Sequence, residues 1–115
     1  MNKSQAIALL RENGCDVGEC VTLARRNAGK DVFWMTPKFD VLDRDWTIIL
    51  NDTNEHKLYM LFVPGNCIRP DQVRAKTGDP EKMHIEIRCD TFIDEKSTNR
   101  ELSFRQWIQH SVSYE

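Results

Sequence analysis

The strongest constraint on the fold is the segment at residues 45–61, DWTIILNDTNEHKLYML. Its five polar residues, 52–56, lie between two largely apolar runs, and they form either a catalytic cluster or the loop of a hairpin. Pairing the two runs across a five-residue loop favours the hairpin, because large apolar side chains then meet on one face. The pairs expected on that face are Leu50–Leu58, Ile48–Met60 and Trp46–Phe62.

Two helices are expected before this hairpin. Ser4 is a suitable cap for the first, over residues 4–13. The second is expected from Asp16 to Gly29, because Asp16 and Glu19 match a capping box. Its apolar stripe at helical spacing is Val17, Cys20, Val21 and Ala24.

The rest of the chain is expected to be mainly strands. They are DVFWM at 31–35, a short or edge strand at 38–43 after the bend at Pro37, and KMHIEIRC at 82–89. Trp34 and Phe39 are expected in the core. Ser103 and Gln106 match another capping box and predict a short C-terminal helix, with a strand at 102–104 as the alternative.

The expected architecture is therefore a single α+β domain spanning residues 1–115. Two N-terminal helices pack on a mostly antiparallel sheet of four to five strands, and a short helix follows at the C-terminus. Residues 58–63 are apolar on both faces, so they are expected at the centre of the sheet. Residues 64–82 are expected to form a long, mostly irregular connection.

Charge and cysteine spacing narrow the class of protein. Sixteen Lys and Arg against eighteen Asp and Glu give a net charge of −2, so no overall positive field attracts nucleic acid or a membrane. No secretory signal or apolar run of about 20 residues is evident, and a cytoplasmic location is expected. The cysteines lack the C-x2-C spacing of zinc sites and are expected to be free thiols: Cys15, Cys20, Cys67 and Cys89.

A metal-dependent nuclease is the alternative enzymatic hypothesis. Such a site combines carboxylates that hold Mg²⁺ at about 2.1 Å with a cation that steadies the scissile phosphate. Glu55 would lie in the hairpin loop, where nothing rigid holds it, and Arg88 cannot act as a base, so neither candidate set is favoured. The two sets are Asp45, Glu55 and Lys57, and Asp71, Glu86 and Arg88.

Two groups of residues are candidates for binding. His84, Glu86 and Arg88 alternate along one strand and share a face, which is either a ligand or partner surface or an ordinary solvated face. A second group, the cations Arg25, Arg26 and Lys30, suggests a helix pair that binds nucleic acid. This is not favoured, because recognition helices usually read bases with their N-terminal residues.

The function expected from the sequence is therefore a small cytosolic interaction module without enzymatic activity. Three expected helices do not cover a sheet completely, and a bare apolar face or a free edge is typical of an association surface. The expected partner is a second copy of the chain or another protein, and no cofactor is expected. The nuclease with Mg²⁺ and the nucleic-acid binder remain the alternatives.

Overall fold

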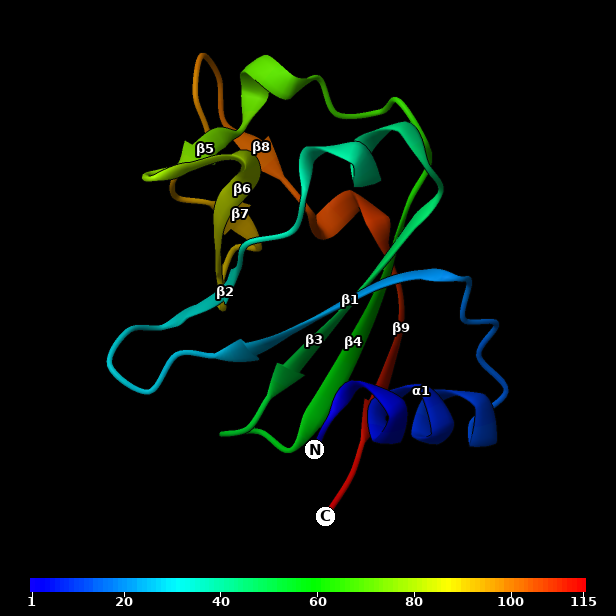
Figure 1. Ribbon diagram of the computed structural model, residues 1–115. Helices are drawn as coiled ribbons and strands as arrows, with labels where there is room; N and C mark the ends of the chain where they lie inside the picture. The colour runs from blue at the N-terminus through cyan, green and yellow to red at the C-terminus, as the bar shows by residue number, and fades with distance from the viewer.

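The computed structural model describes residues 1–115 and is dominated by one curled sheet of nine strands (Figure 1). The strands are β1 (Cys20–Arg26), β2 (Val32–Met35), β3 (Trp46–Asp52), β4 (Lys57–Val63), β5 (Arg74–Lys76), β6 (Asp79–Arg88), β7 (Ile93–Asp94), β8 (Leu102–Ser103) and β9 (Ile108–Ser113). Their order is β8-β7-β6-β2-β1-β3-β4-β9, and β5 pairs with β6. Only β1 and β3 are parallel neighbours.

A single α-helix, α1 (Lys3–Glu12), packs on the outer face of the sheet, and three short 3-10 turns interrupt the connections. The turns are η1 (Phe39–Asp43), η2 (Pro70–Gln72) and η3 (Arg105–Trp107). The first predicted helix is thus confirmed, with its cap at Asn2 in place of Ser4. The side chain of Asn2 accepts from the backbone N–H of Gln5 at 2.8 Å, and the Gln5 side chain accepts from Asn2 at 2.9 Å.

The predicted fold class is wrong, because the second helix expected over residues 16–29 does not form. Residues 20–26 are β1, which lies between β2 and β3 and packs apolar side chains on both faces of the sheet. Val21 and Leu23 pack towards α1, while Ala24 belongs to the core inside the curl. A strand that is apolar on both faces lacks a clear alternation, so its apolar residues also fit helical spacing.

The C-terminal helix and the strand at 38–43 are also wrong. Residues 102–113 form β8, η3 and β9, and residues 39–43 form η1. The alternative strand at 102–104 is confirmed in β8. Phe39 packs against the core as expected, but the indole of Trp34 lies on the surface with 51% of the residue exposed.

The hairpin is confirmed as β3 and β4, with a register that differs from the prediction by one residue. Trp46 lies opposite Val63, and Asp52 stays in the strand opposite Lys57. The side chain of Asp52 accepts from the backbone N–H groups of Asn54 and Glu55, each at 3.1 Å, which closes a four-residue loop in place of the expected five. A slip of one residue moves the side chains of β4 to the other face relative to those of β3. The expected same-face pairs of Trp46, Ile48 and Leu50 with Phe62, Met60 and Leu58 are therefore wrong.

Two cores result from this register. The larger, with 17 buried residues, fills the inside of the curl and contains Trp46, Ile48 and Leu50. The smaller, with 7 buried residues, lies between α1 and the outer face and contains Ile49, Leu58 and Met60. α1 does not cover the outer face of β2 and β6, which leaves Trp34 exposed there. No helix here has the length and apolar character that a bilayer crossing requires.

Candidate functional site

The most distinctive feature of the sheet is a gap between β1 and β2, which we call the β1–β2 gap. The two strands pair at only two positions, Arg25 with Trp34 and Arg26 with Phe33. Beyond this point β1 continues along β3, whereas the chain after β2 stays beside β6, where Pro37 C=O accepts from Met83 N–H at 2.8 Å. The neighbours in the sheet therefore separate immediately after Trp34.

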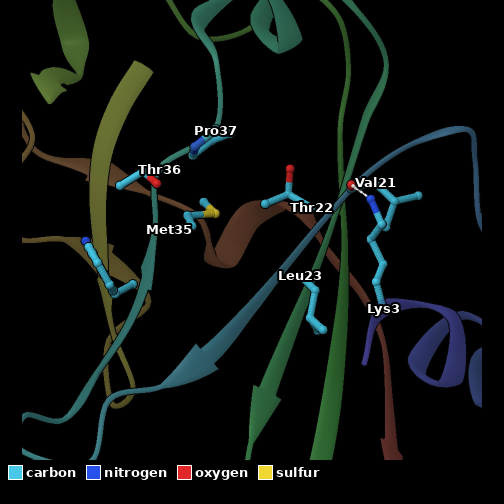
Figure 2. A pocket seen from close by; sticks show the side chains of 8 residues that line it. Lys3, Val21, Thr22, Leu23, Met35, Thr36 and Pro37 are labelled. Carbon is cyan, nitrogen blue, oxygen red and sulfur yellow. Dashed lines mark hydrogen bonds between the residues drawn. The ribbon is translucent and has the colours of Figure 1, made fainter. Parts of the chain in front are cut away.

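The β1–β2 gap is a cavity of about 520 Å³, lined by residues 21–23 on one border, residues 34–37 on the other, and Lys3 of α1. Figure 2 shows the two borders and the side chain of Lys3, which reaches from α1 to the carbonyl of Val21. The volume lies in the range of roughly 300–1,000 Å³ that is common for ligand clefts.

Both borders direct backbone groups into this gap. Asn27 N–H donates to Val32 C=O at the hairpin turn, and backbone groups of an antiparallel pair alternate in direction along the strand. The backbone N–H and C=O of Arg25 therefore point to β2. Those of Leu23 and Val21, two and four residues earlier, point into the gap. The carbonyl of Val21 accepts from Lys3 Nζ at 3.2 Å instead of from a strand. On the other border, the same alternation directs the backbone of Thr36 into the gap, because that of Pro37 faces β6.

Trp34 stands at the closed end of the gap. Its ring forms an edge contact with the His84 ring, with centroids 6.3 Å apart, and 51% of the residue is exposed. Beyond it lies a second depression of about 410 Å³, which Trp34 and Leu23 share with residues 25–27. The indole thus borders two depressions on one surface.

The cations near the gap differ in whether they have acidic partners. Arg25 is exposed and forms no ion pair; its guanidinium donates to the backbone carbonyl of Met1 at 2.8 Å. Lys3 likewise bonds only a carbonyl. Arg26 and Lys30, by contrast, are each held by two carboxylates. The surface around Trp34 therefore carries positive charge from Arg25 and Lys3 that no carboxylate balances.

The three residues expected to share a face of one strand lie on β6, next to this surface. His84 Nε2 lies 2.7 Å from Glu86 Oε2, and Lys30 Nζ lies 2.8 Å from Glu86 Oε1. Burial raises the pKa of Glu86, but the hydrogen bonds from Lys30 and His84 outweigh it and hold the pKa below its usual value. Arg88 pairs with Asp90 and Glu95. These side chains already satisfy one another.

The cations suggested for nucleic-acid binding do not lie on a helix. Arg25 and Arg26 belong to β1 and face opposite sides of the sheet, and Lys30 lies in the turn before β2. Arg26 bonds Asp52 and Asp31, and these contacts, with that to Asp31 the strongest, raise the pKa of Arg26. Of the three, Arg25 alone lacks an acidic partner.

The residues of the first nuclease set are spread along the hairpin. Asp45 precedes β3 and accepts from Gly65 N–H at 3.0 Å, whereas Glu55 lies in the loop after β3. A strand of seven residues spans about 23 Å, so these two carboxylates are far apart. Lys57 begins β4 beside the loop.

In the second set, Glu86 and Arg88 share the outer face of β6, while Asp71 lies on η2 and pairs with Arg69 at 3.3 Å. No three or more His, Cys, Asp or Glu side chains are grouped so that they could hold a metal ion together. The structure therefore places Glu86 and Arg88 together and gives Asp71 a different ion-pair partner.

Comparison with known proteins finds no family model, no curated protein and no solved structure that matches this chain. The functional interpretation therefore depends on the geometry of the β1–β2 gap and of Trp34. Sequence reasoning missed both features, although one signal pointed to them. Pro37 and the bend before it mark where the chain after β2 turns away from β1.

Proposed function

We propose that this chain is an interaction domain without enzymatic activity, and that it binds an extended segment of a partner protein in the β1–β2 gap. The observation that carries the proposal is the early separation of β1 from β2, which leaves backbone groups of both borders without a strand partner. Addition of a strand to such groups is a common mode of peptide recognition, in which backbone hydrogen bonds supply affinity.

The backbone of the gap fits a short extended segment. Val21 and Leu23 offer N–H and C=O groups on one border, and Thr36 offers them on the other. Pairing with either border engages about three or four residues of the partner, since each residue of a strand advances about 3.3 Å. Lys3 must release the carbonyl of Val21 when the segment binds.

Trp34 supplies the side-chain anchor. Tryptophan is enriched among the few residues that dominate binding energy, because a large ring is desolvated when it is covered. The gap also offers Leu23, Met35 and Pro37 as apolar walls. An apolar side chain of the partner that packs beside Trp34 therefore fits this surface.

Charge complementarity favours a partner segment with carboxylates. Arg25 and Lys3 have no acidic partners, whereas Glu86 is already bonded by Lys30 and His84. The same surface on a second copy presents the same unbalanced cations, so a different, acidic protein is the better match here. The proposal requires neither a cofactor nor a metal ion. All four cysteines are free thiols, which supports a cytoplasmic location as part of the proposal.

The test is a selection from a displayed library of random peptides of about ten residues, followed by affinity measurements on the enriched sequences. We expect them to combine one bulky apolar residue with two or more carboxylates. Arg25→Glu should weaken binding about tenfold, with the loss shrinking at high salt because the charges are exposed.

Arg44→Glu is the matched control, since Arg44 is exposed, forms no ion pair and lies outside the gap. It changes the net charge equally and should leave the affinity as in the wild type. N-methylation of the peptide at alternate residues should also abolish binding, because it removes backbone donors. Enriched peptides that bind both arginine variants equally, or that tolerate every N-methyl group, would show that the gap is not the site.

A further inference from the structure

The sheet has one long free edge, which is independent of the β1–β2 gap. β9 (Ile108–Ser113) ends the strand order and pairs only with β4, so its other side presents unpaired backbone groups (Figure 1). Three consecutive residues in its middle are exposed: Gln109, His110 and Ser111. Neither α1 nor a loop covers these positions.

β9 lacks most of the features by which natural proteins prevent edge strands from pairing. It has six residues and contains no Lys, Arg, Asp, Glu or Pro. At the opposite end of the order, β8 has only two residues, a length that itself discourages pairing. A bulge shifts the register between Ile108 and His110, but residues 110–113 pair regularly with β4 and so present a straight edge.

We propose that β9 is a self-association surface, at which two copies of the chain join their sheets through antiparallel pairing of β9 across a two-fold axis. Because Tyr114 N–H donates to His56 C=O, the alternation of the β4–β9 pair directs the backbone N–H and C=O groups of Ser111 and Ser113 to the free edge. Pairing centred on Ser111 therefore sets this residue opposite its counterpart in the second copy, and His110 opposite Val112. Because β9 contains no Lys, Arg, Asp or Glu, the pairing brings no permanent like charges together.

A second copy fits this edge better than a foreign peptide does. Domains that bind peptides by strand addition read alternate side chains with pockets beside the edge. None of the five main cavities is lined by a residue of β9. Self-pairing needs no such pocket, because the same strand supplies both sides of the contact.

The experiment is sedimentation equilibrium of the wild type and of Ser111→Lys between about 1 and 100 μM, a range that covers weak dimers. The wild-type mass should rise from 13.5 kDa towards twice that value, and Ser111→Lys should stay at the monomer mass. The reason is that the substitution places two lysines directly opposite each other at the axis. Ser4→Lys, an equal change at an exposed position of α1, should dimerise like the wild type.

If Ser111→Lys does not fold, hydrogen exchange of the wild type replaces it, and the amides of β9 should gain protection as the concentration rises. A wild type that stays monomeric throughout overturns the proposal. So does a dimer that Ser111→Lys leaves intact, or one that Trp34→Ala abolishes, since that dimer would form through the β1–β2 gap. A dimer that keeps full affinity in Trp34→Ala and is lost in Ser111→Lys supports it, whether or not the gap binds peptides.

Discussion

Replacing Trp34 with alanine should remove most of the affinity for a selected peptide. A covered tryptophan side chain buries about 150–250 Å². Since 51% of the residue is exposed, roughly 75–125 Å² remains for a partner to cover. At about 25 cal/mol per Å² this area contributes roughly 2–3 kcal/mol, which corresponds to a loss of affinity of about 25- to 200-fold.

Fluorescence anisotropy of a labelled peptide measures this loss, and circular dichroism verifies that the variant is folded. The matched control is Phe62→Ala, which removes a half-buried aromatic ring from β4, a strand that does not line the gap. This control should lower stability to a similar extent but leave the dissociation constant within about twofold of the wild type. Affinity in Trp34→Ala within that same margin, or an equal loss in Phe62→Ala, would refute the assignment of Trp34 as the anchor.

Three further predictions concern stability and thiol chemistry. The carboxyl of Asp94 is buried, and one of its oxygens has no hydrogen-bond partner. Burial raises the pKa of this carboxyl, so the stability that its protonated form contributes is lost as the pH rises through the folded pKa. Asp94→Asn should therefore raise the free energy of unfolding in urea by about 1 kcal/mol at pH 7 and leave it unchanged near pH 3. Burial raises the pKa of the Cys89 thiol to about 11. A thiol reagent at mildly alkaline pH should therefore label the exposed Cys67 quickly and Cys89 slowly, and Cys67→Ser should remove the fast phase of labelling. Equal labelling rates at the two cysteines would contradict this prediction. The indole N–H of Trp46 donates to the Thr22 hydroxyl at 2.9 Å, so Thr22→Val should lower the unfolding free energy by about 1–3 kcal/mol, and an unchanged urea midpoint would count against that contact.

Local patterns in the sequence predicted the elements whose two faces differ in polarity. α1 has one buried stripe, with Ala6 and Leu10 fully buried, and β6 alternates buried and partly exposed residues. β1 could not be recognised in this way, because it carries apolar residues on both faces, with Val21 and Leu23 on one and Cys20 and Ala24 on the other. Its parallel pairing with β3, which follows some twenty residues later, is a long-range contact that leaves no local signal.

The C-terminal segment shows a different limit of local reasoning. Phe104, Trp107 and Ile108 have helical spacing, and the first two rings do pack together, with centroids 5.5 Å apart. The contact forms across the single turn η3, after which Ile108 starts β9. The chain there pairs with β4, and such tertiary pairing overrides a weak helical preference.

The candidate site could be predicted only in part. The alternation in residues 32–35 indicates that Phe33 and Trp34 face opposite sides, but it does not say which side is the core. Inside the curl the core takes Phe33 and Met35, and Trp34 is left outside because α1 lies over β1, β3 and β4 instead of β2. The gap arises because β1 and the chain after β2 follow different neighbours, a property of the whole sheet.

The most direct test of the central claim is amide hydrogen exchange, followed by NMR residue by residue, with and without a saturating selected peptide. Strand addition in the β1–β2 gap predicts that protection rises at Leu23, whose N–H faces the gap, or at Thr36 on the other border, according to which strand the peptide joins. Thr22 and Ala24, whose N–H groups face β3, should remain unchanged. Protection that changes equally at all four amides, or only outside the gap, would contradict the account.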